Sequence, residues 1–253
     1  MSICPETYYQ SLTAPIDRIK LEMAACLRWA DRLGLSEGIC NHFSVEVPDK
    51  PGTFLLNPQG LHWSEIRASD IITVATDGTL LDGKHEAEPT AFFIHSGIHR
   101  NVSNAKVVLH THMPNATTLA CLDDGEVIHC TQNSLRWFNR ISYDKDYNGL
   151  ALDHAEGNRM AALMQGNRVL FLANHGVIVI GPNMAEAFDD LYYLERACEI
   201  QVQAMQTGRP LAIIDGKHGE YAYQQIMNDR SQCYSHLEAI IRVLLRESKD
   251  LAG

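Results

Sequence analysis

Residues 107–112 read VVLHTH, an apolar run that passes directly into two histidines, His110 and His112. The run then breaks at Met113-Pro114. Because side chains two positions apart on a β-strand point to the same face, both imidazoles project together from the end of a buried strand. This spacing predicts two ligands of one metal ion, held at a separation that the strand sets.

A second apolar run ends in the same manner. Residues 170–176 read LFLANHG, which places His175 at the end of a strand and a glycine turn directly after it. Three histidines without a cysteine are typical of a catalytic metal site with an open coordination position rather than of a closed structural site. We therefore predict that His110, His112 and His175 bind Zn²⁺, while the same ligand type also suits Fe²⁺, Mn²⁺ and Co²⁺.

The composition is that of a globular protein with one large domain or two small ones. Of 253 residues, 45% are hydrophobic and 21% are charged, which is enough apolar material to bury a core. The formal net charge of −10 argues against nucleic acid and anionic membranes as partners. No apolar run of about 18 residues predicts a membrane span, and residues 1–6 do not resemble a signal peptide. Seven scattered cysteines without a C-x-x-C pair fit a reducing compartment, so we expect a cytoplasmic protein.

Hydrophobic periodicity and turn residues divide the chain into alternating elements. Helices are expected over residues 16–33, 89–101, 115–122, 153–165, 185–206 and much of 220–248. Strands are expected over residues 42–47, 53–56, 71–75, 106–110, 141–143, 169–173 and 177–180. This order predicts a three-layer α/β/α domain around a central mixed or antiparallel sheet. We assign residues 1–15 to an N-terminal extension, 16–210 to the domain, and 211–253 to a C-terminal helical segment that forms an oligomer contact.

Several further motifs share their order and spacing with one protein family. They are CNHFSV at residues 40–45, NPQG at 57–60, His95-x-x-x-His99 and NHG at 174–176. Together with HTH at 110–112, they make residues 15–210 resemble the class II aldolase/adducin head-domain family, in particular its adducin-like bacterial branch. The resemblance implies a single α/β/α domain with Zn²⁺ on the three histidines that match His110, His112 and His175. It also implies a C4 homotetramer with sites between subunits, and metal-bound enediolate chemistry on sugar phosphates.

One position departs from the aldolase pattern. The aldolases have an acidic residue four positions before the helix histidine that matches His95, and this chain has Ala91 there. Pro89 and Thr90 stand where the aldolases have a serine pair that helps to hold the phosphate, and Gln59-Gly60 keeps part of the other phosphate-binding turn. The resemblance therefore leaves as candidate substrate-binding residues Asn41, Gln59, Gly60 and Thr90.

The missing acid raises the question of which residue serves as a base. Enediolate chemistry needs a base within hydrogen-bond reach of the proton that moves. Glu88 lies about one helical turn before Ala91 and is the candidate; alternatively, it complements the helix dipole from the first turn. A metal site without such a base still polarises a carbonyl group, but it does not easily run the aldol cycle.

The polar and aromatic segment 132–143 offers further candidates. Arg136 and Arg140 would hold a substrate carboxylate through paired hydrogen bonds, and Tyr143 would donate a proton. In the aldolases, groups from about this region reach the site of a neighbouring subunit. The alternative is a solvated helix whose aromatic residues pack at a subunit contact.

These features predict a metal-dependent carbon–carbon lyase that acts on a small oxygenated carbonyl compound or carboxylate. Decarboxylation fits the missing acid better than aldol cleavage does, because it needs an electron sink but no base that removes a carbon-bound proton. Two alternatives stay open: an adducin-like module that keeps the fold for assembly without catalysis, and an oxygenase with Fe²⁺ on the same three histidines. For the enzyme, we expect a small-molecule substrate and a homo-oligomer.

Overall fold

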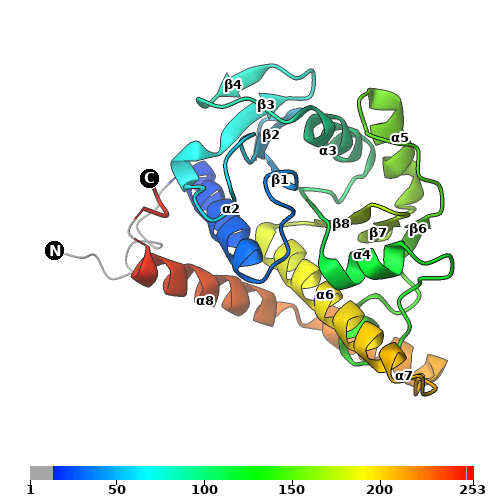
Figure 1. The fold of residues 1–253 in the computed structure, drawn as a ribbon. Coiled ribbons are helices and arrows are strands. Elements are labelled where there is room, and N and C mark those ends of the chain that lie inside the picture. Colours follow the sequence, from blue (N-terminus) through cyan, green and yellow to red (C-terminus); the bar gives the residue numbers. More distant parts are fainter. Residues whose placement is uncertain (1–13, 249) are drawn as a thin grey trace.

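The computed structural model describes residues 14–248 and 250–253, so that most of the expected N-terminal extension, residues 1–15, lies outside the described residues. At its centre is an eight-stranded sheet with the strand order β4-β3-β2-β1-β5-β8-β7-β6, drawn in Figure 1. The strands are β1 (His42–Glu46), β2 (Thr53–Leu56), β3 (Ile72–Ala75), β4 (Leu80–Asp82), β5 (Val107–Thr111), β6 (Ser142–Asp144), β7 (Val169–Leu172) and β8 (Gly176–Gly181).

The sheet is mixed, as the sequence predicted. Every neighbouring pair is antiparallel except β6 and β7, which run parallel. Strands β1 to β4 follow one another in the chain and in the sheet, and β7 and β8 form a second pair of chain neighbours. Strand β5 lies between β1 and β8 and joins these two halves. The VVLHTH segment therefore occupies the middle of the sheet.

Helices cover both faces of this sheet. They are α2 (Pro15–Arg32), α3 (Pro89–Asn101), α4 (Pro114–Ala120), α5 (His154–Leu163), α6 (Met184–Gln206), α7 (Gly216–Asn228) and α8 (Ser231–Glu247). Val107 and Leu109 of β5 pack in the core formed with α2, α4, α6 and α8. Val108 points to the opposite face and packs in the core formed with α3 and α5. The two helical layers are visible in Figure 1 and confirm the predicted three-layer α/β/α architecture.

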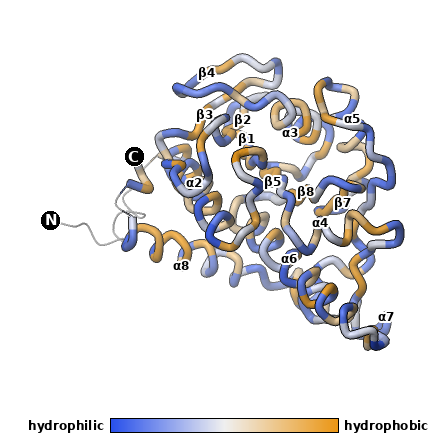
Figure 2. The backbone as a smooth tube through the Cα atoms, viewed as in Figure 1, coloured by the Kyte–Doolittle hydropathy of each residue, from blue (hydrophilic) through white to orange (hydrophobic). Residues whose placement is uncertain are grey.

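The C-terminal helix belongs to the same core. The buried residues of α8 recur at steps of one, three and four (Cys233, Leu237, Ile240, Ile241 and Leu244), and Figure 2 shows the matching alternation of orange and blue along this helix. Its apolar side packs against α2 and α6 of the same chain. The contact within the chain therefore covers this apolar stripe, and the oligomer contact expected for residues 211–253 stays a prediction.

Two details differ from the sequence prediction. Strand β4 was not predicted. It pairs with β3 across a register shift and its three residues are exposed, so it lacks the apolar alternation by which half-buried strands are recognised. The terminal helical segment is two helices, and α7 begins at Gly216, a residue with low helix propensity. Among the described residues, no helix is both long and apolar enough to cross a lipid bilayer.

Candidate metal centre

The predicted metal ligands lie at the end of β5, beside both of its neighbours in the sheet. His110 is the fourth residue of β5 and pairs with His42 of β1 and Ile178 of β8. It is fully buried, whereas His112 is half-buried and follows directly after the strand. Because alternate residues of a strand share a face, both histidines point to the same side as Val108, toward the layer of α3 and α5.

The third histidine comes from the turn between β7 and β8. Asn174 in this turn has a left-handed backbone with φ of 56°, and His175 and Gly176 follow it. At Gly176, a Cβ atom would lie 2.5 Å from the carbonyl oxygen of Thr111 and 2.8 Å from the ring of His112. Only a glycine lets this turn approach the end of β5 so closely, and the approach brings His175 to the other two histidines.

The three imidazoles converge at metal-binding distance. The Nε2 atoms of His110 and His112 are 3.2 Å apart, and the ring centroid of His175 lies 4.8 Å from each of the other two. A four-coordinate zinc ion with Zn–N bonds of about 2.05 Å separates its ligand nitrogens by about 3.3 Å. The spacing therefore fits a metal ion, and we call these residues the three-histidine cluster.

Hydrogen bonding and burial leave ring nitrogens of the cluster free to bind a metal. Nδ1 of His110 donates to the carbonyl oxygen of Val177 at 3.0 Å, so Nε2 carries the lone pair that faces His112. Burial holds the pKa of His110 well below its usual range. The pKa of His175 is lowered to about 4, mainly by burial and to a smaller extent by the neighbouring His112. Burial also lowers the pKa of His112. The three imidazoles are therefore neutral at pH 7, the form in which histidine binds metals.

Asn41 lies beside the cluster, where a substrate-binding residue is expected. Its Oδ1 accepts hydrogen bonds from the backbone N–H groups of Glu37 at 2.9 Å and of His112 at 3.2 Å. Its Nδ2 is buried and has no partner among the described residues, and substrate binding by Asn41 stays a prediction. The charge of the exposed Glu37 partly opposes the lowering of the His112 pKa.

The predicted base, Glu88, is the N-cap residue of α3. Its carboxylate accepts a hydrogen bond from the Ala91 N–H at 2.7 Å and another from the Thr90 hydroxyl group. A carboxylate of the same chain therefore binds a backbone N–H group at the N-terminus of α3 and lies at the positive end of its dipole. This arrangement agrees with the alternative interpretation, in which Glu88 complements the helix dipole. Its proposed role as a base stays untested by this geometry.

The turn that contains Gln59 contacts the segment that leads into α3, and Ala91 in the first turn of α3 is packed among apolar side chains. The Gln59 N–H donates to the carbonyl oxygen of Glu86 at 2.9 Å, and both Gln59 and Gly60 are exposed. Ala91 itself is buried in an apolar cluster with Phe54, Leu56, Ile72, Val74 and Phe92. Substrate binding by Gln59, Gly60 and Thr90 stays a prediction.

Arg136 and Arg140 already have carboxylate partners within the chain. Arg136 donates to Asp189 at 2.8 Å and to Asp190 at 3.3 Å, both on α6. Arg140 forms a paired contact with Glu220 of α7 at 2.9 and 3.0 Å. These contacts favour a structural role, and a role in the site of a neighbouring subunit stays a prediction.

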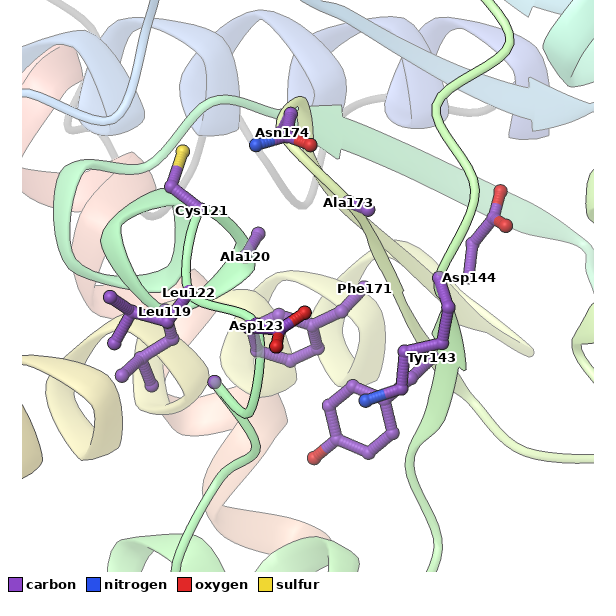
Figure 3. Close-up of a pocket in the computed structure, with 12 residues that line it drawn as sticks. Leu119, Ala120, Cys121, Leu122, Asp123, Tyr143, Asp144, Phe171, Ala173 and Asn174 are labelled. Carbon is purple, nitrogen blue, oxygen red and sulfur yellow. The ribbon is translucent and has the colours of Figure 1, made fainter.

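Tyr143 lines a separate cavity of about 250 Å³ beside the turn that carries His175. Figure 3 shows Tyr143 and Asn174 at opposite ends of this cavity, which none of the three histidines lines. The Tyr143 hydroxyl oxygen accepts a hydrogen bond from the Val127 N–H at 3.0 Å. Burial raises the pKa of Tyr143 well above its usual value, so the hydroxyl group is a poor proton donor. Its expected catalytic role stays a prediction.

A row of buried polar residues adjoins the cluster and was not predicted. His42 and Ser44 of β1 and His95 and His99 of α3 are joined by hydrogen bonds. The ring of His42 also stacks on that of His110, with centroids 4.8 Å apart. The sequence held a signal for this row, because residues two apart on a strand and four apart on a helix each share a face.

The α/β/α domain, with two histidines at the end of its central strand and a third in the β7–β8 turn, has the class II aldolase fold. The chain matches the sequence model of the Class II Aldolase and Adducin N-terminal domain over residues 21–202, and it belongs to this family. A crystal structure of an aldolase II superfamily protein from Pseudomonas syringae superposes with a TM-score of 0.87. That structure is 29% identical and the match covers 98% of this chain and 100% of the other.

Two curated relatives extend this comparison. A class 2 aldolase-type protein of Pseudomonas aeruginosa is 35% identical over 199 residues, which cover 78% of this chain and 76% of the relative. A Streptomyces niveus protein named Decarboxylase NovR is 27% identical over 194 residues, which cover 76% of this chain and 72% of the relative. The family thus includes proteins named for different chemistry.

Proposed function

We propose that this protein is a metal-dependent lyase that decarboxylates a small oxygenated carboxylate. One observation carries the proposal: three neutral imidazoles converge at metal-ligand spacing, while the acidic position of the aldolases is an alanine packed among apolar side chains. A divalent ion on His110, His112 and His175, with Zn²⁺ favoured and Fe²⁺, Mn²⁺ or Co²⁺ compatible, would supply a Lewis acid that stabilises negative charge on a substrate oxygen.

Decarboxylation matches the alanine at position 91, where the aldolases have an acid. In a β-keto acid, the bond between the carboxylate carbon and its neighbour breaks and carbon dioxide leaves. The released electron pair forms the C=C bond of an enolate, the carbonyl π pair moves onto its oxygen, and a proton from water then adds to the carbon. No base has to remove a carbon-bound proton in this step. The name of the Streptomyces niveus relative supports this reaction class.

The start of α3 favours a substrate without a phosphate group. A helix N-terminus attracts anions through its free N–H groups and its dipole. Here the carboxylate of Glu88 already accepts the Ala91 N–H, and its negative charge would repel a phosphate. A carboxylate bound at the three-histidine cluster avoids this repulsion.

We also propose that the chain forms a homotetramer. Tyr147, Leu150 and Leu152 expose 56%, 70% and 59% of their surface on the segment after β6, and exposed apolar groups of this kind are typical of contact surfaces. In such an assembly, Arg136, Arg140 and Tyr143 would act, if at all, at the site of another subunit.

The proposal is tested by metal analysis combined with turnover. Purified protein is expected to contain one divalent ion per chain and to release carbon dioxide from at least one acid in a panel of β-keto and hydroxyaromatic acids. His110→Ala should lose both the ion and turnover, because it removes one of three ligands. His62→Ala is the matched control, since His62 is exposed and lies outside the cluster.

Other results would point to the alternatives. Aldol cleavage of hydroxyketones without carbon dioxide release would refute the decarboxylase. Protein without stoichiometric metal, unchanged by His110→Ala, would favour a module for assembly. Oxygen consumption that depends on added Fe²⁺ would identify an oxygenase.

A further inference from the structure

A continuous row of hydrogen bonds runs from a backbone carbonyl group to His42, whose ring stacks on His110 of the three-histidine cluster. It begins at Ala105, whose carbonyl oxygen lies 2.7 Å from Nδ1 of His99. Nε2 of His99 lies 2.7 Å from the hydroxyl oxygen of Ser44, which also contacts Nδ1 of His95. Nε2 of His95 lies 2.7 Å from Nδ1 of His42. We call His42, Ser44, His95 and His99 the histidine relay.

The carbonyl group at one end fixes the position of every proton in the relay. A carbonyl oxygen only accepts, so Nδ1 of His99 carries a proton and its Nε2 is an acceptor. Ser44 therefore donates its hydroxyl proton to His99 and accepts one from Nδ1 of His95. His95 in turn accepts at Nε2 from Nδ1 of His42. The one ring nitrogen of the relay left without a proton or partner is Nε2 of His42.

This order holds because the three imidazoles are neutral. His42 and His95 are buried, with 2% and 0% of their surfaces exposed, and burial disfavours a charged imidazole. Burial lowers the pKa of His99 to about 4 and holds that of His95 well below its usual range. A proton added at Nε2 of His95 would face the Nδ1 proton of His42, which would leave two donors without an acceptor between them.

The free nitrogen of His42 belongs to the surroundings of the metal centre. His42 lies opposite His110 in the β1–β5 register, and their rings stack with centroids 4.8 Å apart and an angle of 29°. Nε2 of His42 has no hydrogen-bond partner among the described residues. Unlike the fully buried unpaired atoms of the described residues, it retains some accessible surface. His42 is not one of the three converging residues of the cluster, so its Nε2 is not needed to hold the metal ion.

We infer that His42 determines ligand specificity at the metal centre: the relay holds its Nε2 as an obligate hydrogen-bond acceptor, which selects a ligand with a hydroxyl group at this position. The inference rests on the proposed function, because the ligand is held there by the metal. A hydroxyl group donates to this lone pair. An ether or carbonyl oxygen at the same position leaves two acceptors facing each other and unpaired, a loss that discriminates strongly in buried sites.

The proton positions can be observed without any ligand or metal. Long-range ¹H–¹⁵N correlation spectra distinguish a protonated Nδ1 from a protonated Nε2 in histidine. In the metal-free and the zinc-loaded protein, we expect the proton on Nδ1 in His42, His95 and His99. A His42 ring protonated at Nε2 would overturn the inference, whatever the protein catalyses.

Ligand selection is measured by calorimetry on zinc-loaded protein with glycolate and methoxyacetate, which differ by a methyl group on the hydroxyl oxygen. We measure the ratio of the affinity for glycolate to the affinity for methoxyacetate. This ratio should be roughly tenfold higher for the wild type than for a protein without the acceptor. His42→Phe should lose this added preference while it retains the zinc. Ser44→Ala, which breaks the relay but leaves His42 in place, should reduce the preference as well.

Ser142→Ala is the matched control, because Ser142 is also a buried strand serine but donates to the carbonyl oxygen of Met164 in another part of the sheet. It should leave the ratio of the two affinities unchanged. Zinc-loaded His42→Phe and Ser44→Ala with the wild-type ratio would refute the inference and leave the proposed function intact. A wild type that binds no zinc would refute the proposed function and the ligand selection together.

Discussion

Glu88 has two candidate roles, as a base in catalysis and as the cap of α3. Its carboxylate caps α3 through the Ala91 N–H, and replacing a capping side chain by alanine costs about 1 kcal/mol. We expect Glu88→Ala to lower the free energy of unfolding, measured with urea, by about this amount. Glu88→Gln keeps an acceptor oxygen, so it should be closer to wild type.

Turnover decides between the two roles of Glu88. If the residue only caps the helix, Glu88→Gln retains carbon dioxide release. If it is the base, the same variant is inactive although its stability is unchanged, because an amide does not accept the proton.

At the residue scale, the sequence predicted that three histidines lie together, but it did not predict the partners of the arginines. His110, His112 and His175 follow from strand periodicity and a glycine turn, which are local properties. The partners of Arg136 are on α6, more than 50 positions later in the chain, and no local pattern indicates them. The spacing of His42 and Ser44 and that of His95 and His99 each indicated a shared face, but no local pattern showed that this strand and this helix meet to form the histidine relay.

At the scale of elements, α3 and α5 meet through two glycines. A Cβ atom at Gly97 would lie 2.5 Å from the carbonyl carbon of Gly157, and one at Gly157 would overlap the carbonyl oxygen of Phe93. Gly157→Ala should therefore push α5 away from α3 and lower the free energy of unfolding by about 1–3 kcal/mol, although alanine is the better helix former.

Gly216→Ala is the control for this substitution. Gly216 is the first residue of α7, and a Cβ atom there would have no atom within 4 Å. It should be neutral or stabilise the protein by about 0.4–1 kcal/mol. Equal urea midpoints for Gly157→Ala and the wild type would show that the two helices do not need this close approach.

The helices and strands themselves were largely predictable, because most carry a clear apolar period. Strand β5 and the β7–β8 pair were expected within one or two residues of their observed bounds. The order of strands in the sheet was not predictable in the same way. The insertion of β5 between β1 and β8 depends on packing across the whole domain, which no single segment encodes.

At the scale of the whole molecule, the exposed apolar segment of Tyr147, Leu150 and Leu152 makes assembly testable. Light scattering should give the mass of four chains for the wild type. The double variant Leu150→Lys and Leu152→Lys should shift the mass toward smaller species, because burying the new charges at a contact is costly. Leu33→Lys, at an exposed apolar residue at the end of α2, should leave the mass unchanged. A wild type of single-chain mass would refute the tetramer.

The separation of the third histidine from the other two also sets the order of events during synthesis. Protein chains leave the ribosome from the N-terminus at about 5–20 residues per second. His110 and His112 therefore emerge several seconds before the β7–β8 turn supplies His175, and β5 waits equally long for β8, its second neighbour. We expect the newborn chain to hold a metal ion only weakly at first, and metal capture to be a late step of maturation rather than a nucleus for folding.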